Sequence, residues 1–193
     1  MKYTPKIRKA VRFAIKVHEL DQKQKRKGKD IAYITHPMTV ALILATAGAR
    51  ENVIVAGLLH DAIEDCVADC PVTTTDIIKE FGEEVAKLVD SITEQEPNLP
   101  WAERKKQTLK LIKEEFSENS ILLKSADVLS NGTEIIDDYE EIGDEVFERF
   151  NTNRDQKIQS QIALITTLLQ YYPTNPLTED LKKLVKDFKE LRG

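Results

Sequence analysis

Apolar residues recur every three or four positions along most of the chain, the spacing that gathers them on one face of an α-helix. In the first segment this stripe consists of Ile7, Ala10, Val11, Ala14, Ile15 and Val17. We find no convincing run of alternating apolar and polar residues, which would indicate a half-buried strand, and no internal repeat. The pattern therefore predicts an all-α fold.

Helix start and stop signals divide this pattern into successive elements. Pro37 suits the start of a helix, and Thr74 or Thr75 can cap a helix that ends at Phe81. Two prolines make residues 96–100 a linker. After the first segment, helices are predicted near 36–48, 51–65, 74–81, 83–93, 101–115, 118–130, 144–150, 154–171 and 177–191.

Length and composition set limits on the class of protein. The 193 residues are 41% hydrophobic and 32% charged, which excludes disordered and collagen-like chains and favours one domain over residues 1–193. Cys66 and Cys70 are too few for a disulfide framework, so a reducing, cytoplasmic location is expected. The longest mostly apolar stretch, residues 38–49, is too short to cross a bilayer, and no membrane partner is expected.

Charge is distributed unevenly along the chain. Residues 1–29 hold eleven Lys or Arg and two acids, a charge of +9, whereas the remainder carries −14. Five of these cations lie within residues 23–29. A locally positive loop on an acidic protein indicates capture of a small anion, although a solvated helix end would show the same charges. Extended nucleic acid is not an expected partner, because the acidic remainder would repel it.

A dipeptide with metal-binding chemistry follows the apolar run at residues 53–59. His60 and Asp61 come directly after it, and Glu64 and Asp65 lie four positions later, one turn on if the helix continues. An acidic cluster at the end of a buried helix is costly unless a cation compensates its charge. The alternative is a cluster of charges that faces solvent.

Two further residues fit the same chemistry. His36 lies among apolar neighbours at a helix start, and Asp127 follows the mostly apolar residues 121–126. Singly, such a His is more often a hydrogen-bonded core residue, and such an Asp is more often paired with Lys or Arg. With His60 and Asp61 they form an N₂O₂ set, a ligand mix suited to a divalent metal.

This series of residues resembles the H…HD…D pattern of the HD-domain metal-dependent phosphohydrolases. More closely, it is similar to the hydrolase part of the RelA/SpoT-type enzymes and to their small stand-alone relatives. The resemblance covers roughly residues 4–151, and its matching stretches are residues 24–28, 33–37, 57–65, 81–85 and 124–131. One departure is Val128, which stands where the family usually has Arg or Lys.

The resemblance implies a compact multi-helix HD-domain bundle with a metal site at its centre. It implies removal of the 3′-pyrophosphate from guanosine tetraphosphate or pentaphosphate, with Mn²⁺ as the expected ion. Carried over by position, the metal ligands are His36, His60, Asp61 and Asp127; Glu64 and Asp65 activate water; Arg26, Lys27, Lys124 and Asn131 contact the nucleotide.

Two other functions remain open at this stage. One is hydrolysis of a different phosphorylated nucleotide, since the sequence does not fix the base or the phosphate pattern. The other is a non-catalytic nucleotide sensor, against which the intact pair of Glu64 and Asp65 argues, because a sensor needs no water-activating carboxylates. The oligomeric state also remains open.

Overall fold

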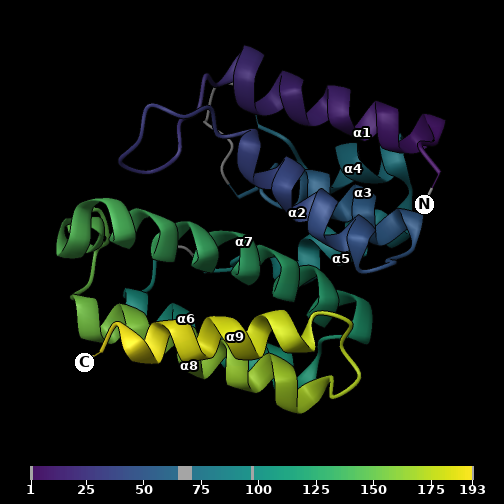
Figure 1. Ribbon diagram of the computed structural model, residues 1–193. Coiled ribbons are helices and arrows are strands. Elements are labelled where there is room, and N and C mark those ends of the chain that lie inside the picture. Colours follow the sequence, from purple (N-terminus) through teal and green to yellow (C-terminus); the bar gives the residue numbers. More distant parts are fainter. Residues whose placement is uncertain (1, 65–70, 97, 193) are drawn as a thin grey trace. The chain divides into compact units, whose positions relative to one another are not determined.

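The structure, a computed structural model, describes residues 2–64, 71–96 and 98–192. Over these ranges the regular elements are helices joined by loops (Figure 1). One of these loops contains an isolated bridge between Lys25 and Ala32. The prediction of an all-α fold is confirmed. Among the helices of the described ranges, none combines the length and apolarity needed to cross a membrane.

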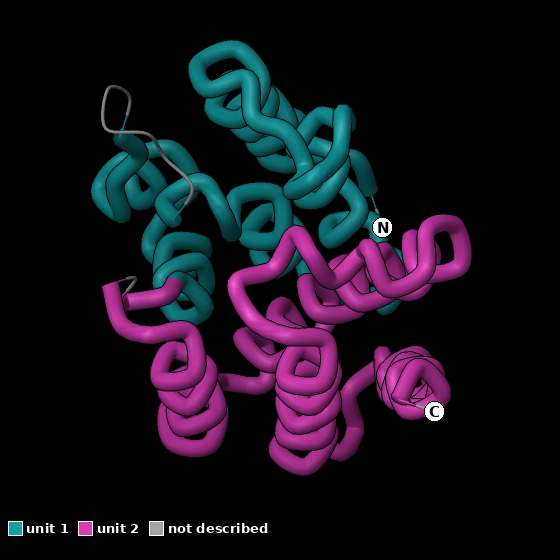
Figure 2. The backbone as a smooth tube through the Cα atoms, turned by 90° about the vertical axis from the view of Figure 1, so that its left-hand side faces the viewer, with its two compact units in different colours: residues 1–93 teal, residues 94–193 magenta. Residues whose placement is uncertain are grey.

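Contacts within the chain divide it into two compact units, residues 1–93 and 94–193 (Figure 2). The division falls just before the predicted linker at residues 96–100. Buried apolar side chains occur throughout both units, so each has a core of its own. That the whole chain acts as a single HD-type domain stays a prediction.

The first unit is built around a short helix that is buried over most of its length. Its elements are α1 (Pro5–Ile15), the π-helix η1 (Lys16–Asp21), α2 (Thr35–Thr46), α3 (Glu51–Leu59), α4 (Thr74–Phe81) and α5 (Glu83–Ile92). Residues 53–59 of α3 are all buried, and α3 packs against α1, α2 and α5. A Cβ atom at Gly57 would come within 2.6 Å of the Leu44 side chain. Glycine at this position therefore permits the close approach of α2 and α3.

The predicted continuation of the third helix beyond Leu59 is wrong. Residues 60–64 form a turn, in which the Ala62 N–H donates to the Leu59 carbonyl at 3.0 Å. The Gly57 carbonyl lies 2.9 Å from His60 Nδ1 and accepts its proton. A side chain thus satisfies one of the carbonyls that a helix end leaves unpaired. The one-turn relationship expected between His60 and Glu64 on a helix does not apply.

The cap of α4 also differs from the prediction. Thr73, not Thr74 or Thr75, precedes the helix, and its hydroxyl accepts from the Asp76 N–H at 3.2 Å. The Asp76 carboxylate in turn accepts from the Thr73 N–H at 2.9 Å. This reciprocal capping box selects Thr73, because only Thr73 has an acidic residue in position to complete it.

The second unit is organised by its longest helix. Its elements are α6 (Trp101–Glu114), α7 (Glu118–Ile142), the 3₁₀ helix η2 (Gly143–Phe147), α8 (Arg154–Tyr171) and α9 (Thr178–Glu190). Helix α7 packs against both α8 and α9. It approaches α9 closely at Gly132, where a Cβ atom would lie 2.5 Å from the Leu184 side chain.

Two predicted boundaries in this unit are wrong. Helix α7 does not end near residue 130, because Ile135 and Asp138 continue its buried face, and Asp138 pairs with Arg149. The positive φ of 64° at Gly143 ends α7. The helix predicted at 144–150 is the shorter 3₁₀ helix η2. The predicted range 154–171 coincides with α8.

Candidate metal centre

Two buried histidines face each other in the first unit. His36 lies in the first turn of α2, and His60 follows the last residue of α3. Each is 3% exposed, and their Nε2 atoms are 3.2 Å apart. Both side chains offer ligand atoms for a metal ion. The close packing of α2 on α3 at Gly57 brings these two elements together.

The hydrogen bond at His60 fixes which of its nitrogens can bind a metal. A carbonyl oxygen only accepts, so the Gly57 carbonyl requires the proton on His60 Nδ1. In a neutral imidazole this leaves the lone pair on Nε2, the atom that faces His36. Metal-binding histidines commonly donate their other N–H to a backbone carbonyl or a carboxylate in this way.

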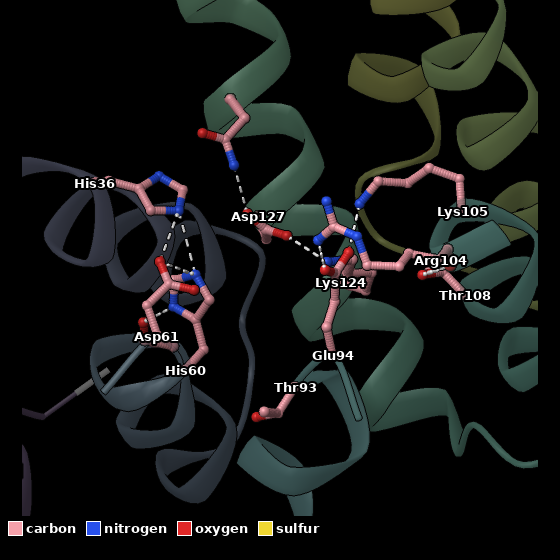
Figure 3. A network of polar contacts seen from close by, with 12 residues as sticks. His36, His60, Asp61, Thr93, Glu94, Arg104, Lys105, Thr108, Lys124 and Asp127 are labelled. Carbon is pink, nitrogen blue, oxygen red and sulfur yellow. Dashed lines mark hydrogen bonds and ion pairs between the residues drawn. The ribbon is translucent and has the colours of Figure 1, made fainter. Parts of the chain in front are cut away.

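Asp61 supplies a third donor atom. Its Oδ2 lies 3.1 Å from His60 Nε2 and 3.5 Å from His36 Nε2 (Figure 3). The Tyr33 hydroxyl donates to the same oxygen at 2.6 Å, which holds the carboxylate toward the imidazoles. The result is a triangle of two nitrogens and one oxygen, built entirely from the first unit.

This donor set fits a divalent metal ion. Imidazole and carboxylate are the ligands of borderline and hard divalent ions. Two nitrogens bound to one zinc ion at about 2.0–2.1 Å lie at most about 4.2 Å apart. The measured separation of 3.2 Å between His36 and His60 is within that limit.

Asp127 lies in the middle of α7 in the second unit and is 7% exposed. Lys124 Nζ donates to its Oδ2 at 2.8 Å, and Asn131 Nδ2 donates to its Oδ1 at 2.6 Å. Figure 3 labels Lys124 and Asp127 on this helix. Two residues predicted to contact the nucleotide therefore orient the predicted ligand. Val128 is buried, and the basic partner of Asp127 on α7 is Lys124.

The basic residues after η1 form a hairpin-like loop, not a helix end. The Arg26 N–H donates to the Ile31 carbonyl at 2.8 Å, and the Tyr33 N–H donates to the Gln24 carbonyl at 2.9 Å. The Arg26 guanidinium carbon lies 5.5 Å from the centre of the Tyr33 ring. Tyr33 thus contacts both Arg26 and the Asp61 carboxylate, and links the basic loop to the donor set.

Two other cations of this loop, Lys25 and Lys27, lie toward solvent. Lys27 is exposed. Lys25 pairs with exposed Asp30 at 2.7 Å, and this hydrogen bond raises the pKa of Lys25. The structure therefore distinguishes Arg26, which packs on Tyr33, from Lys25, whose charge Asp30 balances.

The two carboxylates predicted to activate water are described only in part. Glu64 is exposed in the turn after His60. Asp65 lies outside the described residues, as do Cys66 and Cys70. The role of each carboxylate stays a prediction.

Sequence reasoning assigned no role to Tyr33 or His18. Tyr33 was part of a matching stretch, but a tyrosine within a motif does not reveal that its hydroxyl reaches Asp61. His18 is completely buried, and its ring lies 5.2 Å from that of Tyr33. The signal that could have revealed His18 is its place after Val17, where the buried stripe of the first helix continues.

Comparison with known proteins places the chain in a family. Residues 10–128 match the family model of the HD domain. This range contains all four predicted metal ligands. The chain belongs to the HD-domain family. It is 40% identical over 131 residues to the guanosine-3′,5′-bis(diphosphate) 3′-pyrophosphohydrolase of Aquifex aeolicus, an alignment that covers 67% of this chain. It is 33% identical over 116 residues, 59% of this chain, to the mouse (Mus musculus) enzyme of the same name, MESH1.

These alignments cover only part of the relatives. The chain spans 18% of the Aquifex aeolicus protein and 62% of the mouse protein. Two solved structures are similar over most of their length. A structure from Listeria monocytogenes is 35% identical with a TM-score of 0.69, and the match covers 80% of this chain and 99% of the Listeria chain. The structure of a metazoan SpoT ortholog is 24% identical with a TM-score of 0.76, and the match covers 100% of this chain and 98% of the ortholog's chain. This likeness supports the fold.

Proposed function

We propose that this HD-domain protein is a metal-dependent phosphohydrolase that removes the 3′-pyrophosphate from guanosine tetraphosphate or pentaphosphate. The observation that carries the proposal is the triangle of His36 Nε2, His60 Nε2 and Asp61 Oδ2, with separations of 3.1–3.5 Å. Two buried imidazoles beside a carboxylate, with His60 and Asp61 each oriented by a further hydrogen bond, match the usual construction of a metal site.

Asp127 is the proposed fourth ligand. Its support is its burial, the two hydrogen bonds that orient its carboxylate, and its inclusion in the region matched by the HD-domain model. A carboxylate has about four acceptor positions, so the bonds from Lys124 and Asn131 leave capacity for an ion. Mn²⁺ is the proposed ion, as the resemblance to the RelA/SpoT-type hydrolases implies, and the two carboxylates of the set are ligands that suit it.

The substrate class rests on two kinds of support. The relatives from Aquifex aeolicus and mouse are named for 3′-pyrophosphohydrolysis of guanosine-3′,5′-bis(diphosphate). The basic loop provides Arg26 and Lys27 for a highly anionic nucleotide, since a local excess of positive charge attracts phosphates. The proposed compartment is the cytoplasm, in keeping with a chain that has only two cysteines.

The proposed reaction divides the chemistry among these residues. A bound divalent ion would lower the pKa of a water molecule and offset charge on the phosphoryl oxygens. Glu64 and Asp65 would orient that water and take its proton as it attacks phosphorus. The bond from the ribose 3′-oxygen to phosphorus would break, and the 3′-oxygen would take up a proton as it leaves, which gives GDP or GTP and pyrophosphate. Arg26 and Lys27 would hold the nucleotide by charge.

The test is a substrate panel with purified protein and Mn²⁺, read by chromatography of the nucleotide products and by pyrophosphate release. We expect guanosine tetraphosphate to give GDP and pyrophosphate in equal amounts. A matched His36→Ala variant should be inactive on every member of the panel.

Three outcomes would contradict the substrate assignment or the activity. Release of orthophosphate, or faster turnover of another phosphorylated nucleotide, would identify a different HD phosphohydrolase. Tight nucleotide binding without turnover at any metal concentration would identify a sensor.

A further inference from the structure

His18 is a buried imidazole that the proposed reaction does not use. It lies in the π-helix η1 and is 0% exposed. Its Nδ1 lies 2.5 Å from the Gln24 side-chain oxygen, which only accepts, so Nδ1 carries the proton. Its Nε2 is buried and has no hydrogen-bond partner among the described residues. A polar atom buried in this way is costly, so His18 is a candidate for a role beyond packing.

The π-helix holds both ends of the basic loop. At the first end, the His18 carbonyl accepts from the Gln24 N–H at 2.9 Å, in addition to the side-chain bond between the same two residues. At the other end, Glu19 accepts from the Ile34 N–H at 3.3 Å, one residue after Tyr33. Single π-helical turns often occur at functional sites, where they redirect side chains. Here η1 directs two neighbouring side chains to the two ends of one loop.

Tyr33 is where the loop meets the metal centre. Its ring packs on His18 at 5.2 Å, and its hydroxyl donates to Asp61 Oδ2 at 2.6 Å. Arg26 lies over the same ring at 5.5 Å. The position of Tyr33 therefore affects both a proposed ligand and a proposed substrate contact.

We propose that His18 is a positioning residue for the metal centre, which acts through Tyr33 to hold the Asp61 carboxylate toward His36 and His60. His18 holds the loop through its Nδ1–H bond to Gln24, and we call this bond the anchor. The packing of the His18 ring on the Tyr33 ring adds to this restraint. This inference rests on the proposed metal set, and it concerns the affinity of the protein for the ion before any substrate binds.

Two variants separate the anchor from simple packing. His18→Phe keeps a ring against Tyr33 but loses the donor to Gln24, whereas His18→Asn keeps a donor near the Nδ1 position but loses the ring. Mn²⁺ is titrated calorimetrically into metal-free protein, and the Tm is measured in parallel. We expect His18→Phe to weaken Mn²⁺ binding by about threefold to tenfold, below the roughly 10–100-fold typical of residues that contact a ligand directly.

We expect the two measurements to rank the variants in opposite orders. His18→Asn should bind Mn²⁺ better than His18→Phe, although its lost ring packing gives it the lower Tm. If both measurements follow the same order, or if neither variant changes Mn²⁺ affinity, His18 has only a structural role and the proposal is wrong.

A double-variant cycle with Tyr33→Phe tests the route of the effect. Tyr33→Phe removes the bond to Asp61, so His18→Phe should change Mn²⁺ affinity by less than about twofold in that background. Equal effects of His18→Phe in both backgrounds would overturn the proposal. His18→Asn replaces His18→Phe in the cycle if the latter does not fold.

His36→Ala separates this inference from the proposed metal site. If Mn²⁺ binds normally to His36→Ala, the metal site itself is misassigned. If His36→Ala abolishes binding while the His18 variants bind normally, only the role of His18 fails.

Discussion

The donor atoms of the two units are held in different ways. In the first unit, His36 comes from α2, the adjacent residues His60 and Asp61 come from the turn after α3, and the hydroxyl that holds Asp61 belongs to a residue 28 positions away. In the second unit, Asp127 is held by Lys124 and Asn131, three residues before it and four residues after it on the same helix.

This difference determines which structural changes would displace the donor atoms of each unit. Neighbours at i−3 and i+4 meet on any regular helix, so the surroundings of Asp127 require only that α7 forms. The triangle in the first unit also requires that α2 packs on α3, that the helix ends at Leu59, and that the loop returns Tyr33 to Asp61. The positions of the donor atoms in the first unit therefore depend on tertiary structure, whereas the surroundings of Asp127 depend on local structure.

The largest expected effect comes from removing the proposed ligand of the second unit, Asp127. Asp127→Ala should abolish metal binding and reduce kcat/KM by about 10³-fold or more, because the several kcal/mol contributed by a bound ion are lost. The fold should survive, since each unit has its own core. Elemental analysis, circular dichroism and activity are measured on Asp127→Ala and on Asp137→Ala, a control on the exposed face of α7. Normal metal content in Asp127→Ala would show that the first unit alone holds the ion.

The next largest effect is expected at the turn that follows the triangle. Glu64→Gln keeps the shape of the side chain but cannot accept the proton of water, so kcat should fall by about 10²–10⁴-fold with metal content unchanged. Asp65→Asn should behave similarly, and the double variant should lose less than the product of the two single losses. Near-normal turnover in Glu64→Gln would refute its role, and loss of metal would make it a ligand.

The sequence predicted the parts of this molecule that depend on local patterns. The range of α8 required only helical spacing. The end of α3 could not be predicted, because it depends on a bond from the His60 side chain to the Gly57 carbonyl. The role of Tyr33 depends on the path of the loop between η1 and α2, and no spacing rule encodes that path. Residue types at the ends of apolar stretches thus suggested the candidate ligands, but local spacing did not predict the contacts that orient them.

Asn131 offers a test of whether local support of a ligand matters as much as distant support. If Asn131 orients Asp127, then Asn131→Leu should lower Mn²⁺ affinity by about 10–100-fold, the range typical of residues that hold a ligand. If Asn131 contacts only the nucleotide, KM should rise and Mn²⁺ affinity should stay unchanged. Calorimetric titration with Mn²⁺, together with kcat and KM at saturating metal, distinguishes the two roles.

The basic loop should affect substrate binding more than the chemical step. Arg26→Ala should raise KM by about tenfold or more, since one charge-assisted contact contributes roughly 1.5–3 kcal/mol. Lys25→Ala is the matched control, because Asp30 already balances the charge of Lys25. KM is measured at several salt concentrations for both variants and for Arg26→Ala combined with Lys27→Ala. Unchanged KM and unchanged salt dependence in the double variant would make this loop an ordinary solvated surface.

The smallest effect is expected from a local contact with no connection to the donor atoms. Hydrogen bonds from the Thr73 side chain and backbone lower the pKa of Asp76, so the folded state favours the ionised carboxylate. A group with a lowered folded pKa stabilises the protein above its unfolded pKa, about 3.9, and loses that contribution as the pH falls through its folded pKa. Asp76→Asn should therefore lower the Tm by at most a few degrees at neutral pH, and the difference from the unchanged protein should shrink as the pH falls below about 4. Mn²⁺ affinity should be the same in both proteins. A Tm difference that does not change with pH would show that the capping box does not depend on the charge of Asp76.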